Sequence, residues 1–237
     1  MNEDNVIVLG SKPDEKILKI KFQSLYAANA AVEKAQIYKK INEKIKINSV
    51  CSFRGFLYDP PTSTRVKSSK PDRLIIRRGN LEKPKELNEN CKMLCFDKKK
   101  QWKFQRIFFK YGFFSLILSE LFYGNNFKEG LINFKNNIVY KKGLLGVSTG
   151  FFAILLALKE NPDKNIFVSG ISMTDGGHFY NLHDKLKDVN QRRKVDKFLI
   201  KLLHKKYKKR MFSCDREFAN LANINYFENN KYWTNKL

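Results

Sequence analysis

The chain has 237 residues, of which 43% are hydrophobic and 14% aromatic, a composition that excludes a disordered chain and is sufficient for a buried core. Lys and Arg number 46 against 23 Asp and Glu, so the formal net charge is +23. This charge favours a polyanionic partner such as nucleic acid, an anionic membrane surface or a phosphorylated substrate, although a solvated lysine-rich surface explains it equally well. No apolar run is long enough to span a membrane, and no secretory signal is recognisable, so we expect a cytoplasmic protein with reduced cysteines.

The first half of the chain alternates short apolar runs with helical or loop-like segments. Five runs have the composition of buried strands: residues 5–9, 23–28, 47–53, 73–78 and 92–96. Residues 30–45 carry apolar side chains at helical spacing and predict a helix. The composition of residues 59–71 (DPPTSTRVKSSKP) predicts a loop.

The second half is richer in helix signals. Residues 101–123 predict one long and very apolar helix, which we expect to pack in the core rather than against a membrane. Residues 148–160 predict a helix with Ser148 or Thr149 as its N-cap. The remaining segments are a strand or loop at 136–142, strands at 165–171 and 210–214, a glycine-containing loop at 173–184, a basic helix at 189–209 and a further helix from 217.

The alternation of apolar strands with helices predicts an α/β fold, with a mainly parallel sheet covered on both faces. We expect one domain over residues 1–237, with no internal repeat or linker. In such sheets ligands bind beyond the carboxyl ends of the strands. The loops that follow the strands are therefore the candidate ligand-binding segments, including residues 10–13, 28–30, 77–80 and 169–180.

Two loops carry anion-binding signals of limited specificity. Gly10 follows the first strand, but residues 10–13 contain neither a dinucleotide-binding nor a Walker motif. Ser148 and Thr149 open a helix, whose free amides favour an anion, although an ordinary N-cap explains them too. Residues 146–150 (GVSTG) also have the letters of an esterase elbow, with Asp175 and His178 or Asp196 and His204 as triad partners, but the preceding segment is a poor strand.

The positions of the histidines, acidic residues and cysteines limit which catalytic or metal sites the chain can form. His178 and His183 lie after a predicted buried strand, where a neutral imidazole can take a proton from a hydroxyl. His204 lies in the basic helix and is expected to be solvated. The chain contains no Asp-x-Asp pair, which disfavours a metal-dependent nucleotide-sugar enzyme. Cys91 and Cys95 have no second close pair, so no zinc site is expected.

Four sequence blocks resemble bacterial CMP-sialic acid transferases and the related CMP-Kdo-type transferases. These blocks are VIVLGSKP (6–13), LYAANAA (25–31), GVSTGFFAILLAL (146–158) and IFVSGISMTDGGHFYN (166–181), and their order and spacing also fit the family. The resemblance covers roughly residues 5–220. It implies a single Rossmann-like domain of the GT-A variant type, with a lid at approximately residues 175–195. It also implies transfer of a 2-keto sugar acid from CMP to a hydroxyl of a glycan such as lipopolysaccharide, without a metal or other cofactor.

The resemblance also assigns roles to residues of this chain. It places the CMP-binding positions at Gly10, Ser11, Asn29, Ser148, Thr149, Gly150, Ser169, Gly170 and Thr174, to which the positive charge of Lys12 is added on physical grounds. Tyr180 matches the tyrosine that hydrogen-bonds the departing phosphate, and Thr174 stands where the family has a second such tyrosine. The stretch that matches the family's general-base histidine, residues 190–194, contains none, so His183 or His178 takes that role. Arg192 and Arg193 are further sources of positive charge.

Two alternatives to an active transferase remain. A nucleic-acid-binding protein fits the charge, with Phe108 and Tyr111 as base-stacking residues, although no RNA-binding motif is present. A donor-binding homologue that has lost catalysis fits the missing histidine. For the transferase, the excess charge predicts peripheral attachment to the inner face of the cytoplasmic membrane, since each basic residue near an anionic surface adds up to about 1 kcal/mol of attraction.

Overall fold

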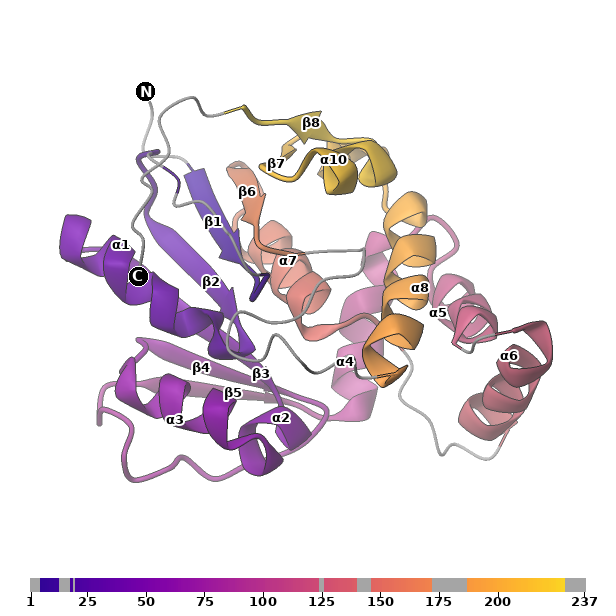
Figure 1. Ribbon diagram of the computed structural model, residues 1–237, viewed down its shortest axis with the longest axis horizontal. Coiled ribbons are helices and arrows are strands. Elements are labelled where there is room, and N and C mark those ends of the chain that lie inside the picture. Colours follow the sequence, from indigo (N-terminus) through magenta and orange to yellow (C-terminus); the bar gives the residue numbers. More distant parts are fainter. Residues whose placement is uncertain are drawn as a thin grey trace.

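The computed structural model describes residues 5–12, 18, 20–123, 126–139, 146–171 and 187–228, with side chains in the last stretch from residue 192 onward. Its centre is an eight-stranded sheet in the order β5-β4-β3-β2-β1-β6-β7-β8 (Figure 1). The strands are β1 (Asn5–Leu9), β2 (Ser24–Ala28), β3 (Lys46–Ser52), β4 (Arg73–Arg77), β5 (Lys92–Phe96), β6 (Asn165–Ser169), β7 (Met211–Ser213) and β8 (Asn225–Tyr226). All neighbouring strands are parallel, so the predicted α/β class with a mainly parallel sheet is confirmed, and the arrangement is Rossmann-like.

Helices cover both faces of the sheet, because alternate residues of the strands pack in opposite directions. Ile7 and Leu9 of β1 belong to one buried cluster, while Val6 and Val8 belong to the other. The first cluster is completed by the 3-10 turn η1 (Asn29–Ala31) and helices α1 (Val32–Ile41), α2 (Phe53–Tyr58) and α3 (Pro60–Ser68). The second contains α7 (Thr149–Glu160), α8 (Lys187–Leu202) and α10 (Arg216–Ala222). The central helix α7 is buried over eight consecutive residues, 151–158, as expected for a helix within an α/β core.

The long helix predicted over residues 101–123 is wrong. This stretch belongs to a series of short elements: α4 (Lys98–Gln105), the 3-10 turn η2 (Arg106–Phe108), α5 (Phe113–Ser119), the 3-10 turn η3 (Glu120–Phe122), α6 (Phe127–Phe134) and the π-helical turn η4 (Lys135–Val139). The break falls where Phe109 bridges to Leu203 and where Gly112 adopts a φ of +53°, a conformation that glycine tolerates best. A strand or loop was predicted at 136–142. Residues 136–139 of this stretch belong to the helical turn η4, and residues 140–142 lie outside the described residues.

Other element boundaries also differ from the predictions. Residues 59–71 are not a loop, because prolines are compatible with the first turn of a helix and Asp59 accepts a hydrogen bond from the Thr62 hydroxyl at 2.6 Å. The basic helix at 189–209 is interrupted at Leu203, and α9 (Lys205–Lys208) follows separately. The first helix ends at Ile41, and β8 was not predicted. Within the described ranges, no helix has the length and apolar character needed to cross a membrane.

Candidate functional site

The sheet order creates a switch point between β1 and β6. From β1 the chain builds β2, β3, β4 and β5 outward on one side, and then returns to place β6 on the other side of β1. The residues that follow β1 and those that follow β6 therefore lie side by side beyond the carboxyl ends of these strands. In open parallel sheets this is where ligands bind, and the positions that the sequence singled out lie here.

The two switch-point loops, residues 10–12 and 169–171, are joined through their backbones. The Gly10 amide donates to the Ser169 carbonyl at 2.8 Å, and the Lys12 amide donates to the Gly170 carbonyl at 2.9 Å. A Cβ on Gly10 would lie 2.0 Å from the Gly170 carbonyl oxygen, so only glycine permits this approach. Gly170 itself has a φ of +68°. The glycines that the sequence marked are therefore required by the backbone geometry of this edge.

Asn29 lies one strand away, directly after β2. Its φ of +52° is in the left-handed region, where asparagine is enriched. Its side-chain oxygen Oδ1 is buried and has no hydrogen-bond partner among the described residues. A buried acceptor without a donor costs about 1–3 kcal/mol, so it marks a position where a hydroxyl or amino group of a ligand would be stabilising.

The N-terminus of α7 faces the same edge. Ser148 is the N-cap, since its Oγ accepts a hydrogen bond from the Phe151 amide at 3.3 Å, which confirms the predicted cap. Thr149 is buried, and its hydroxyl accepts a bond from the Arg77 guanidinium at 3.3 Å. Gly150 packs against Ile171, whose side chain would lie 3.4 Å from an added Cβ. The start of this helix, with its partial positive charge, thus adjoins the loop after β6.

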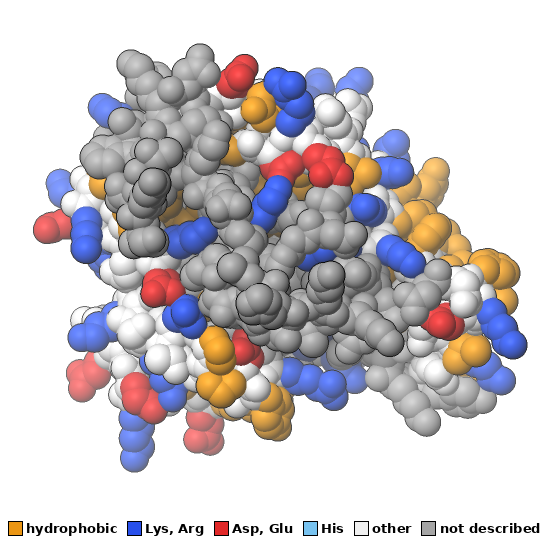
Figure 2. Space-filling view, in the orientation of Figure 1, with side chains coloured by type: hydrophobic (Ala, Val, Ile, Leu, Met, Phe, Trp, Pro, Cys, Tyr) orange, Lys and Arg blue, Asp and Glu red, His pale blue; other side chains and the backbone are white. Residues whose placement is uncertain are grey.

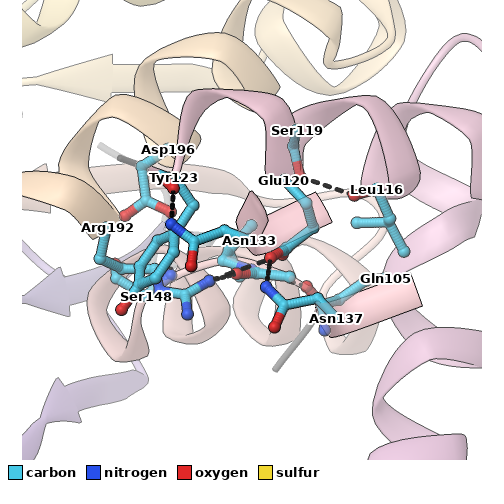
Figure 3. Close-up of polar contacts among 12 residues, drawn as sticks. Gln105, Leu116, Ser119, Glu120, Tyr123, Asn133, Asn137, Ser148, Arg192 and Asp196 are labelled. Carbon is cyan, nitrogen blue, oxygen red and sulfur yellow. Dashed lines mark hydrogen bonds and ion pairs between the residues drawn. The ribbon is translucent and has the colours of Figure 1, made fainter. Parts of the chain in front are cut away.

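The esterase alternative does not fit this geometry. Ser148 contacts Asp196 directly, because its amide donates to the Asp196 carboxylate at 2.9 Å (Figure 3). A serine hydrolase places a histidine between serine and aspartate. His204 begins α9 instead, where its backbone amide donates to the Phe108 carbonyl. The other proposed partners, Asp175 and His178, lie outside the described residues.

A cluster of charged side chains packs against the residues at the start of α7. It consists of Arg77, Arg78, Arg192, Glu120 and Asp196. Burial lowers the pKa of Arg77 to about 9, assisted by the neighbouring charge of Arg192, and lowers the pKa of Arg78 in the same way. Burial also raises the pKa of both carboxyls, more than the nearby guanidinium groups lower it. Each charge is thus costly to bury, and the cluster depends on mutual compensation.

Hydrogen bonds tie this cluster to the segment that precedes α7. Arg77 donates to the Val147 carbonyl, and Arg192 donates to the Gly146 carbonyl at 2.8 Å. Arg192 also lies 3.9 Å from the Glu120 carboxylate and 4.7 Å from the centre of the Tyr123 ring (Figure 3). Side chains from β4, η3 and α8 therefore converge on residues 146–149 and fix where the helix begins.

Lys12 is held away from the start of α7. Its ammonium group lies 2.5 Å from the Asp215 carboxylate at the N-terminus of α10. Partial burial raises the pKa of Asp215, but the hydrogen bonds from Lys12 and the Phe218 amide outweigh this effect and hold the pKa below its usual value. The positive charge of Lys12 is thus compensated within the fold. Arg193 is half-buried on α8.

The predicted site residues divide into two groups. At the carboxyl edge of the sheet the structure brings together those that follow β1, β2 and β6 and those that begin α7: Gly10, Ser11, Lys12, Asn29, Ser148, Thr149, Gly150, Ser169 and Gly170. Outside the described residues lie the predicted catalytic and phosphate-contacting side chains: Thr174, His178, Tyr180 and His183. The predicted lid at 175–195 is described only from residue 187, as the beginning of α8.

Sequence reasoning named Arg192 as a source of positive charge and Asp196 as a possible triad partner, but it missed that they belong to one charge cluster. The run RLIIRR at 73–78 held the signal, since two arginines directly follow an apolar strand and one of them must lie at the ligand edge. Glu120 and Asp196 gave no such signal, because each lies in a helical pattern where a carboxylate is expected to face solvent. Phe108, named as a base-stacking residue, is fully buried and unable to stack on a base.

The described residues define an α/β protein with a candidate ligand site at its sheet switch point. Among them, no group of three or more His, Cys, Asp or Glu side chains could hold a metal ion. Comparison with models of known families, with curated proteins and with solved structures gives no significant match for this chain. The assignment of a ligand class therefore depends on the motifs and on the geometry of this edge.

Proposed function

We propose that the protein is a glycosyltransferase that moves a 2-keto sugar acid, Kdo or sialic acid, from CMP to a hydroxyl group of a glycan. The observation that carries the proposal is the pair of switch-point loops, bonded to each other through Gly10 and Gly170 beside the N-terminus of α7. The N-terminus of α7 carries a partial positive charge, which is a favourable environment for a nucleotide phosphate. The resemblance of the four sequence blocks supplies the identity of the nucleotide.

Asn29 adds support for a nucleoside at this edge. Its buried Oδ1 needs a donor, and the cytosine amino group and the ribose hydroxyls of CMP are suitable donors. The chemistry would also make use of this environment. As the acceptor hydroxyl attacks the anomeric carbon of the sugar acid, the bond to the phosphate oxygen breaks and CMP leaves with an added negative charge. The partial positive charge at the N-terminus of α7 would stabilise that charge.

The proton of the acceptor hydroxyl requires a base, for which we propose His183 or His178. Tyr180 is proposed to donate a hydrogen bond to the departing phosphate, with Thr174 beside it. No metal is assigned a role in this scheme, because the charge on CMP is balanced by hydroxyls, amides and basic side chains. The acceptor class is a surface glycan such as lipopolysaccharide, whose lipid anchor would require the enzyme to work peripherally at the inner face of the cytoplasmic membrane.

The first test is the release of CMP from CMP-Kdo and CMP-sialic acid in the presence of detergent-solubilised acceptor glycans. We expect turnover of one donor, and a loss of that turnover in either H183A or H178A. No CMP release from either donor, together with no detectable CMP binding, would overturn the proposal. CMP binding without turnover would identify the protein as a donor-binding homologue without catalysis.

A matched pair of variants isolates the contribution of Asn29. Asn29→Gly keeps a residue that tolerates positive φ but removes the buried acceptor, so CMP affinity is expected to fall about tenfold. Asn223→Gly is the control, because Asn223 has the same φ of +52° but lies after α10, away from the switch point. Equal CMP affinity in the two variants would contradict a role for Asn29.

A further inference from the structure

Helix α5 has an inverted distribution of side chains. Its polar residues Ser115 and Ser119, with Glu120 directly after it, are fully buried, whereas Phe114 is 70% exposed and Leu118 is 43% exposed. A surface helix normally turns its apolar face toward the core and its polar face toward water. Helix α5 buries Leu116 beside its two serines, yet it turns Phe114 and Leu118 toward water, so its outward face is suited to an apolar environment outside the protein.

Helix α6 continues the same surface. Its buried side is Gly130, where an added Cβ would lie 2.1 Å from the Leu121 carbonyl oxygen, so this face packs tightly on η3. Its opposite side exposes Phe127 (71%) and Leu131 at i and i+4, with Ile132 next to them. Figure 1 places these two short helices at the same end of the molecule, and both expose apolar side chains there.

The exposed apolar side chains are concentrated here. Of the fifteen exposed large hydrophobic residues of the described chain, ten lie within residues 107–139. We call these ten the apolar patch: Ile107, Tyr111, Phe113, Phe114, Leu118, Phe122, Phe127, Leu131, Ile132 and Val139. Figure 2 shows hydrophobic side chains gathered at the end of the molecule where α5 and α6 lie, with Lys and Arg among them. Patches of this kind mark protein or membrane interaction sites.

Cations surround the apolar patch. Residues 98–139 contain two carboxylates, of which Glu120 is fully buried, against eight Lys and Arg. Five of the exposed cations lie close in sequence to the apolar residues: Lys103, Arg106, Lys110, Lys128 and Lys135. The bridge between Phe109 and Leu203 brings a further basic stretch, residues 205–210 (KKYKKR), next to Lys110. Exposed aromatic rings with basic residues at their edge match the interface of an anionic bilayer.

We infer that the apolar patch and its surrounding cations form a docking surface for an anionic lipid bilayer, with the rings of α5 and α6 inserted at the level of the headgroups. A second copy of this chain fits less well, because a face-to-face contact would bring the cations of both copies together. A nucleic acid would place phosphates against exposed Phe and Leu side chains. The inference does not depend on the proposed donor or reaction, since it uses no residue of the carboxyl edge.

The test is co-sedimentation of the full-length protein with vesicles of phosphatidylcholine mixed with phosphatidylglycerol, and with vesicles of phosphatidylcholine alone. We expect binding to the mixed vesicles only. The double variant F114S/F127S is expected to weaken this binding at least about tenfold, because it removes two of the most exposed rings from the bilayer contact. Tyr58→Ser is the matched control, since Tyr58 is 75% exposed on α2, outside the apolar patch, and its variant should bind as the wild type does.

Three results would overturn the inference. One is the absence of binding to the mixed vesicles. Another is equal loss of binding in F114S/F127S and Tyr58→Ser. The third concerns other partners. If the wild type does not bind vesicles but forms a dimer in light scattering, or binds single-stranded RNA, and F114S/F127S abolishes that interaction, the surface belongs to that partner instead. Circular dichroism of F114S/F127S, expected to match the wild type, shows that loss of binding is not loss of fold.

Discussion

The carboxyl edge of the sheet and the helical segment between β5 and α7 place their side chains in opposite ways. Beside the edge, charged residues that usually face water are buried: Arg77 and Asp196 are each no more than 2% exposed. In the helical segment, rings that usually face the core are exposed, as Phe114 and Phe127 illustrate. Both arrangements cost stability in the isolated chain, since one desolvates charge and the other hydrates apolar surface.

The two regions differ in what offsets their unfavourable free energy. The buried charges are largely compensated by one another and fix the start of α7, so their cost is recovered within the fold. Within the part of the chain that the structure describes, the most exposed rings, Phe114 and Phe127, have no compensation of that kind, so their cost is recovered only on contact with another surface. Substitutions in the two regions should therefore differ sharply in their effects on stability and on binding.

The largest effect is expected from Asp196→Ala. This change removes the acceptor for the Ser148 amide and leaves the arginines of the cluster, of which Arg77 is fully buried, facing one carboxylate, which is expected to cost about 4 kcal/mol of unfolding free energy. Arg77→Met is the balancing variant, because it leaves two arginines facing two carboxylates and should cost about half as much. Urea denaturation measures the loss of unfolding free energy in each variant. Equal losses would show that the stability of the cluster does not depend on charge balance.

A smaller loss is expected from Gly10→Ala. The new Cβ would meet the Gly170 carbonyl at 2.0 Å, so the switch-point loops must separate, at a cost of about 3 kcal/mol and with loss of CMP binding. Gly150→Ala is the contrasting variant, since its Cβ would make ordinary contact with Ile171 at 3.4 Å and alanine favours a helix. Thermal unfolding should separate the two, and a stable Gly10→Ala protein that binds CMP would refute the role given to this approach.

The ion pair at the edge of the site should contribute a modest and pH-dependent amount. Asp215→Asn keeps an acceptor for the Phe218 amide but removes the charge that pairs with Lys12, so at neutral pH it should cost about 0.5 kcal/mol, because the pair is partly exposed. The folded-state pKa of Asp215 is lowered, so its contribution is present above the unfolded value of about 3.9 and is lost as the pH falls through the folded value. Unfolding curves of the two proteins should therefore converge in acid. A difference that persists there would assign the effect to the cap.

The smallest effect on stability is expected from Phe127→Ser. The ring is 71% exposed, so its removal should change the unfolding free energy by less than about 0.5 kcal/mol. Vesicle binding by the same protein should nevertheless decrease. If Phe127→Ser unfolds as easily as a core variant such as Phe151→Ala, which should cost about 4 kcal/mol, the apolar patch is part of the core and not a surface.

The sequence predicted the sheet well and the helical segment poorly, for physical reasons. The strands are short apolar runs bounded by turn residues, and their burial on both faces leaves an unambiguous signal. Apolar residues of the segment over 101–123 occupy every side of a helix, so periodicity could not reveal that Ser115 and Ser119 face inward while Phe114 faces outward. Gly112 was the one local sign that a single helix would not persist there.

The candidate site was predictable only in part. Glycines directly after strands identify the ligand edge without any knowledge of packing, which explains why Gly10 and Gly170 were found, and Ser148 was found because serine is a typical N-cap. The contributions of Glu120 and Asp196 come from helices that the chain reaches much later than β4. Their contacts with the arginines depend on how α8 and η3 pack, a tertiary effect that no local pattern encodes.

The most direct test of the account is amide hydrogen exchange of the full-length protein with and without CMP. We predict that CMP slows exchange at residues 10–12, 29–31, 148–151 and 169–171, and leaves the apolar patch over residues 107–139 unchanged. Addition of anionic vesicles should produce the reverse pattern. Protection by CMP confined to residues 107–139, or no protection at the switch-point loops at saturating CMP, would contradict the assignment of the carboxyl edge as the nucleotide site.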